Sequence, residues 1–243
     1  MNAKTSRLLT AALGAGALGF CLRTILYRVG FDDKHIISSC HPLHLACLGL
    51  TALLAVYLLL AIRRDHGAVI FQDTPLRSMA SLAAACLMGY HGLSLRHDMA
   101  GLLEIARMAL ALSSAACMAI CALPGMLRRS IYGVFLGIIS IFFAVDMLCR
   151  YQNWSGNPQL PDYTLQVLAS VLLALCSYHR LAFCTGLGKR RALMLCCLPG
   201  LALCLMCAAG PETRGFYLGG AFWAGACICS TLPPEEADPH VSA

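Results

Sequence analysis

Several ionisable side chains lie inside long apolar stretches of this sequence, and six of them are Arg23, His44, His91, Glu104, Arg107 and Asp146. Placing a charge among lipid chains costs about 3 kcal/mol or more, so such residues usually face the interior of a helix bundle. There they pair with one another or bind a ligand. Because the set contains cations, carboxylates and imidazoles, it is suited to bind an anion, a zwitterion or a proton.

The depth of these residues favours one shared site. If the N-terminus is cytoplasmic, all six fall in the outer half of the membrane, and we expect the first five helices to form a polar cavity that opens outward. The alternative is structural. Arg23, Glu104 and Arg107 then extend to the interface from helix ends, and Asp146 pairs with Arg150 one turn later.

A second candidate site lies just before the second apolar stretch, where Cys40, His41 and His44 occur together. If Pro42 occupies the first turn of a helix, His41 and His44 share a face of it. Imidazole and thiolate are ligands of divalent transition metals, so the three residues form a candidate metal site. The alternative is a capped helix start. The sequence does not identify a cofactor.

Cysteine is abundant, with 15 residues, and most of them fall inside the apolar stretches. A buried thiol behaves as a small apolar group, so we expect these cysteines to pack in the core without a network of disulfides. The alternative is a metal or redox role, for which Cys204 and Cys207 share one helical face.

The composition places these residues in a membrane protein. Hydrophobic residues make up 59% of the 243 positions and charged residues 12%, too few to cover a water-soluble domain. We predict an all-α, polytopic transmembrane bundle of about eight spans, since helices satisfy their own backbone groups in lipid. The predicted spans are 8–27, 42–62, 76–95, 102–123, 131–149, 163–187, 192–209 and 215–232.

Two features leave a count of seven open. Lys4 and Arg7 precede the first apolar stretch, as in a secretory signal, although the stretch is long enough to remain as an anchor. The third and fourth spans are the least apolar.

We expect one transmembrane domain over residues 1–232, followed by a short acidic, proline-containing tail, 233–243, which we expect to be cytoplasmic and disordered.

The distribution of cations predicts the orientation, with both termini in the cytoplasm. The predicted inner cations are Lys4, Arg7, Arg63, Arg64, Arg77, Arg128, Arg129, Lys189, Arg190 and Arg191. Those predicted outside are Arg28, Lys34, Arg96, Arg150 and Arg214. The net charge of +6 is therefore explained by topology, and with no compact basic domain we expect no nucleic-acid partner.

Small residues predict close helix packing in the first and last spans. They are Ala12, Ala15, Gly16, Gly19, Gly215, Gly219, Ala221 and Gly225. These faces can pack within the chain or form a homo- or hetero-oligomer.

Three functions fit these features. The first is a small transporter or permease in the plasma or inner membrane, which binds a small molecule or ion in its outward cavity. The second is a membrane-embedded redox or metal-dependent enzyme. The third is a non-catalytic accessory or sensor subunit. The sequence favours a protein that is not an enzyme.

The topology can be tested with reporter fusions. We expect reporters in loops 63–74, 124–130 and 188–191 to be cytoplasmic, because these loops carry the excess of cations. Reporters accessible to protease from outside in two of the three loops would contradict the orientation.

Overall fold

The computed structural model describes residues 3–29, 41–63, 74–98, 101–123, 129–155, 160–210 and 213–230. These residues form helices and no strand, which confirms the all-α prediction. The elements are α1 (Ala3–Val29), α2 (Pro42–Ile62), α3 (Pro75–Ser94), the 3-10 helix η1 (Leu95–Asp98), α4 (Leu102–Cys121), α5 (Arg129–Ser155), α6 (Leu160–Cys184), α7 (Arg190–Cys207) and α8 (Arg214–Cys229).

Six helices are long and apolar enough to cross a membrane, so the chain is a multi-pass membrane protein. They are α1, α2, α4, α5, α6 and α7. The other two, α3 and α8, pack against each other. With 16 residues, α8 is about 24 Å long, and most of its side chains are buried by the surrounding helices. The structure is consistent with the predicted bundle of about eight spans.

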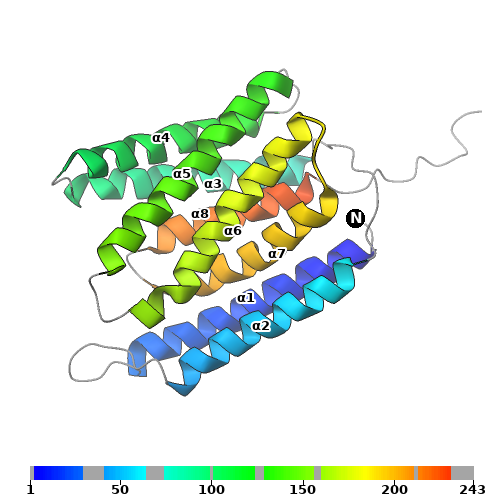
Figure 1. Ribbon diagram of the computed structural model, residues 1–243, viewed down its shortest axis with the longest axis vertical. Helices are drawn as coiled ribbons and strands as arrows, with labels where there is room; N and C mark the ends of the chain where they lie inside the picture. Colours follow the sequence, from blue (N-terminus) through cyan, green and yellow to red (C-terminus); the bar gives the residue numbers. More distant parts are fainter. Residues whose placement is uncertain are drawn as a thin grey trace, which may run out of the picture.

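The helices form two groups that share α7 (Figure 1). In the larger group α3 packs on α4, α4 on α5, α5 on α6 and α6 on α7, while α8 packs on α3, α6 and α7. In the smaller group α1 and α2 pack on each other and on α7. The core of the bundle therefore lies around α7 and α8.

Two helices begin with a capped turn that contains proline. The side chain of His41 accepts a hydrogen bond from the backbone N–H of Leu43, and Pro42 occupies the first turn of α2, as predicted. Thr74 caps α3 in the same way, because its hydroxyl oxygen accepts from the N–H of Arg77. Both caps satisfy N–H groups that would otherwise lack a partner inside the helix.

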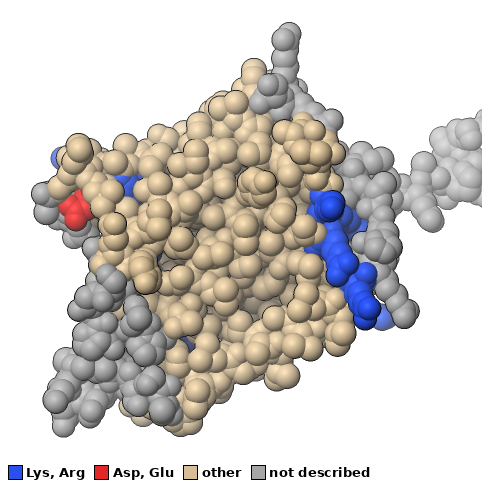
Figure 2. Space-filling view, viewed as in Figure 1, with Lys and Arg blue, Asp and Glu red and all other residues tan. Residues whose placement is uncertain are grey.

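Basic side chains gather at the end of the bundle where α1 and α7 begin, as the blue atoms in Figure 2 show. A hydrogen bond of 3.2 Å from Arg190 Nη2 to Thr5 Oγ1 joins these two helix starts. Arg7, Arg63, Lys189 and Arg191 are exposed. We call this the inner end, because the predicted topology places it in the cytoplasm.

Two of the cations used to predict the orientation are buried within helices. Arg77 on α3 is 4% exposed, and Arg150 on α5 is 5% exposed. Arg150 lies inside α5 because this helix continues beyond the predicted span as far as Ser155. Neither residue contributes to the surface charge on which the positive-inside rule depends.

Glycines allow α1 to pack closely on α7. A Cβ atom added at Gly16 would lie 2.8 Å from Leu205 Cδ1 and 3.2 Å from the backbone Cα of Ala202. At Gly19 it would lie 2.3 Å from Met206 Cγ. In α8, Gly219 and Gly220 are packed against Met88 and Leu173. The small residues of the first and last helices thus form contacts within the chain.

This packing can be tested with a matched pair of substitutions in α1. Gly16→Val should destabilise the protein by about 1–3 kcal/mol more than Gly14→Val, because the added side chain meets α7 and its backbone. A Cβ atom at Gly14 meets nothing within 4 Å, so that variant controls for the β-branched residue. The measurement is unfolding of the purified protein in detergent. Equal losses would contradict the close approach.

Candidate functional site

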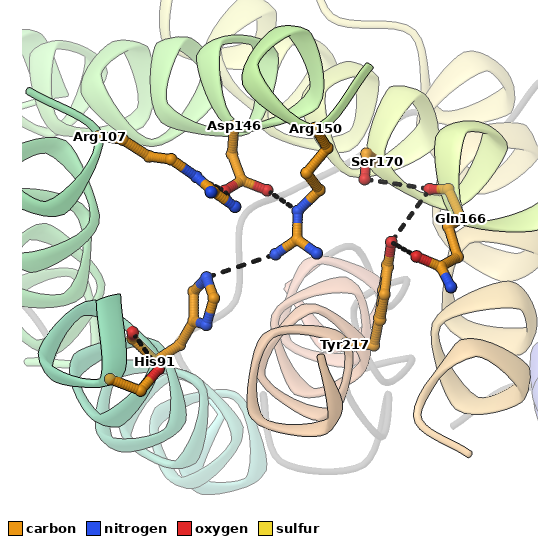
Figure 3. Close-up of polar contacts among 8 residues, drawn as sticks. His91, Arg107, Asp146, Arg150, Gln166, Ser170 and Tyr217 are labelled. Carbon is orange, nitrogen blue, oxygen red and sulfur yellow. Dashed lines mark hydrogen bonds and ion pairs between the residues drawn. The ribbon is translucent and has the colours of Figure 1, made fainter. Parts of the chain in front are cut away.

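A fully buried carboxylate between two arginines is the centre of the site (Figure 3). Asp146 Oδ1 accepts a hydrogen bond of 2.6 Å from Arg107 Nε and lies 2.6 Å from Arg107 Nη2. Its Oδ2 accepts a bond of 2.6 Å from Arg150 Nε. Each carboxylate oxygen therefore binds a different guanidinium, and both bonds are charge-assisted.

His91 and an aromatic pair surround Arg150. The Nη2 atom of Arg150 lies 3.4 Å from His91 Nε2. Because a guanidinium can only donate, Nε2 must accept, which requires a neutral imidazole with its proton on Nδ1. The Arg150 guanidinium also lies over the ring of Phe216, 4.3 Å from its centroid, and 5.7 Å from that of Tyr217. These contacts orient Arg150 from both sides.

The cluster is assembled by four helices that meet at the end of the bundle opposite the inner end, which we call the outer end. His91 lies near the end of α3, Arg107 near the start of α4, and Phe216 near the start of α8. Asp146 and Arg150 lie toward the end of α5, one turn apart. Since these helices alternate in direction, chain positions that are far apart reach the same depth. We call Arg107, Asp146, Arg150 and His91 the outer cluster.

The charges in the outer cluster do not balance. Two guanidinium groups face one carboxylate, and His91 is neutral, so the cluster carries one excess positive charge. The contacts within the outer cluster use Nε and Nη2 of Arg107 and Nε and Nη2 of Arg150, so Nη1 of each arginine takes no part in them. The side chain of Arg107 is 12% exposed, whereas that of Asp146 is fully buried. The arrangement can bind an anion beside Arg107.

A polar seam continues from the outer cluster between α6 and α8. The Tyr217 hydroxyl donates to the backbone oxygen of Gln166 at 3.4 Å, and the Gln166 Oε1 atom lies 3.5 Å away (Figure 3). The same backbone oxygen accepts from the Ser170 hydroxyl at 3.1 Å. Tyr217 therefore has one face toward Arg150 and its hydroxyl toward α6.

The structure brings together three of the six predicted site residues, His91, Arg107 and Asp146. Arg150 joins them, although the sequence analysis assigned it to a loop or to a local pair with Asp146. The local pair exists, but it shares the carboxylate with Arg107. The signal for Arg150 was its spacing of four residues from Asp146, which places both on one helical face.

No contact with the outer cluster is described for the other three predicted residues. Arg23 on α1 donates to the Tyr27 hydroxyl at 2.7 Å and contacts Cys207 Sγ of α7 at 3.8 Å. His44 is buried on α2, on the opposite side of the bundle from α4 (Figure 1). Glu104 is partly exposed in the first turn of α4. The outer cluster is thus built by α3, α4, α5 and α8, with no contribution from α2.

The predicted metal site is incomplete among the described residues. Cys40 lies outside them, and His41 Nδ1 accepts the N–H of Leu43 as the cap of α2. In the part of the chain that the structure describes, no group of three or more His, Cys, Asp or Glu residues is arranged to hold a metal ion. The fourteen described cysteines are free thiols.

Comparison of the chain with protein-family models, with curated proteins and with solved structures finds no match. The function must therefore be inferred from the outer cluster and its surroundings.

A double-mutant cycle distinguishes a buried cluster from arginines that merely extend to the interface. Asp146→Asn should cost about 3 kcal/mol of unfolding free energy, because it leaves two arginines without their carboxylate. Arg107→Gln should cost less, because Asp146 keeps its ion pair with Arg150. The double variant should cost less than the sum, with a coupling energy of about 0.5–3 kcal/mol. Additive losses, measured by unfolding in detergent, would favour the interfacial alternative for Arg107.

Proposed function

We propose that this multi-pass membrane protein is a small transporter or permease in the plasma or inner membrane, whose outer cluster binds an anionic or zwitterionic small molecule. The observation that carries the proposal is the excess guanidinium beside a fully buried carboxylate. One arginine would suffice to neutralise Asp146. A second buried arginine is costly for folding alone, and an anionic ligand would offset that cost.

The geometry suggests which atoms would bind the ligand. Nη1 of Arg107 and Nη1 of Arg150 are the donors that the contacts within the outer cluster do not use. An anionic group between them would form charge-assisted bonds with both. For a zwitterion, the remaining lone pairs of Asp146 would accept from an ammonium group. Asp146 would act as a positioning residue, because it orients both guanidinium groups.

The same contacts supply a way to couple binding to movement. Arg107 and Asp146 belong to different helices, α4 and α5, so their ion pair joins two elements at the outer end. A ligand anion that competes with Asp146 for Arg107 would replace one ion pair by another. The helices could then separate without leaving a charge uncompensated in lipid.

The two other functional classes predict different behaviour. A redox or metal-dependent enzyme would show metal content or visible absorption in the purified protein, and an accessory subunit would show no ligand-dependent stabilisation. Association with a second copy through the Gly/Ala faces stays a prediction. In α1, Gly14 faces open space and is available for such contact.

The test is binding followed by uptake. Purified wild-type protein is screened by thermal unfolding against carboxylates, amino acids, phosphate and sulfate, and stabilising compounds are then assayed for uptake into proteoliposomes. Arg107→Lys should weaken binding at least tenfold, because lysine retains the charge but lacks the forked donors of arginine. Asp146→Asn should abolish uptake while the protein remains folded.

The matched control is Arg96→Lys, which alters an exposed arginine at the same end of the bundle. It should bind and transport as the wild type does. If no compound in the panel stabilises the wild type, or if Asp146→Asn transports normally, the transport proposal fails and a structural role for the outer cluster replaces it.

A further inference from the structure

Another arginine, Arg180, is completely buried near the inner end of the bundle. Its Nη2 atom donates to the Tyr132 hydroxyl, and its Nη1 atom lies 3.6 Å from Cys227 Sγ. Its guanidinium lies over the Trp223 ring, 4.9 Å from the centroid. Trp223 is itself fixed by a bond of 2.9 Å from Nε1 to Ser177 Oγ. Arg180 is therefore oriented by three helices, α5, α6 and α8.

The partners of Arg180 are neutral. A hydroxyl, a thiol and an aromatic face surround it, and no carboxylate contacts it among the residues that the structure describes. Its Nε atom is buried and has no hydrogen-bond partner in the same part of the chain. Arginine remains protonated in proteins, so it cannot escape burial by losing its charge. The outer cluster has Asp146 to offset its arginines, and Arg180 has no equivalent.

Further features favour a ligand from the cytoplasmic side. Arg180 lies four residues before the end of α6, about 6 Å from the inner end of the helix. Tyr132 is partly exposed, so it links the buried guanidinium to the surface. Arg77 lies close enough to act electrostatically on Tyr132 and on Cys121, and it donates to the Cys121 backbone oxygen at 3.4 Å. The inner end therefore concentrates buried positive charge at one place.

We infer that Arg180 and Tyr132 form a binding site for a phosphate group at the inner end of the bundle. A phosphate offers several oxygens, so it can accept from Nε of Arg180 and from the Tyr132 hydroxyl at the same time. Arg180 lies at the depth where the apolar core meets the headgroups, so the group can come from a lipid or from a soluble phosphate.

The inner site is separate from the outer cluster and does not depend on the proposed transport. Tyr132 and Asp146 both lie on α5, about 21 Å apart along its axis. A ligand at one site cannot contact the other directly. Variants of each site therefore serve as controls for the other.

The experiment uses purified full-length protein and two sources of phosphate. In detergent and phosphate-free buffer, inorganic phosphate is added at constant ionic strength and the unfolding temperature is measured. In nanodiscs without inorganic phosphate, phosphatidic acid in phosphatidylcholine is compared with phosphatidylcholine alone. We expect the wild type to be stabilised in at least one arm, and the responding arm identifies the source.

Arg180→Gln should weaken the response at least tenfold, and Tyr132→Phe, which keeps the ring, should weaken it about three- to tenfold. The control Arg191→Gln removes an exposed charge at the same end and should respond as the wild type does. If Arg180→Gln does not fold, Tyr132→Phe carries the test.

Three outcomes would overturn the inner site: a wild type that responds in neither arm, an Arg180→Gln or Tyr132→Phe variant that responds like the wild type, or a response that Asp146→Asn removes. The last result would place the phosphate at the outer cluster. Asp146→Asn that loses uptake but keeps the phosphate response would separate the two sites.

Discussion

A charge enclosed by a membrane bundle has to be neutralised by the protein, and the ion pairs of Asp146 meet that requirement at the outer end. The carboxylate has no exposure and binds an arginine of its own helix and one of α4. Because the pair with Arg107 needs the two helices at one depth and one rotation, it specifies how α4 faces α5. Arg150 extends the constraint to α3 through His91 and to α8 through Phe216. The register of four helices therefore depends on one carboxylate.

Much of the remainder of the bundle is stabilised by close apolar packing, which does not specify helix depth as an ion pair does. Small side chains meet that need between α1 and α7, where Gly16 and Gly19 let Leu205 and Met206 approach the α1 backbone. In the core, cysteines act as small apolar residues between larger ones. Cys204, for example, lies next to Gly220 of α8. Dispersion contacts of this kind are lost quickly when the distance grows, so the glycines matter for stability.

The positions of the helices depend on local composition and could be predicted from the sequence. Which side chains meet depends on the rotation of each helix, and this could not be predicted. Long apolar runs identified the helices, and the charge in those runs identified His91, Arg107 and Asp146. Arg150 was assigned to a loop because it follows the apolar run, and only the continuation of α5 to Ser155 makes it a core residue. Nothing in the spacing could show that Arg23 contacts α7 and not the outer cluster, since the side on which a helix packs is a tertiary property.

The buried arginines at the two ends of the bundle have different partners, and this affects how easily each end can open. At the outer end a carboxylate offsets one of two guanidinium charges, so an ion pair must break or exchange before the helices can separate. At the inner end Arg180 is contacted by a hydroxyl, a thiol and the Trp223 ring, whose interactions are individually weaker than an ion pair. Separating the helices at the inner end would break no ion pair between Arg180 and another described residue. If the bundle changes conformation, the inner ends of α5, α6 and α8 are therefore where an arriving anion meets the least electrostatic competition.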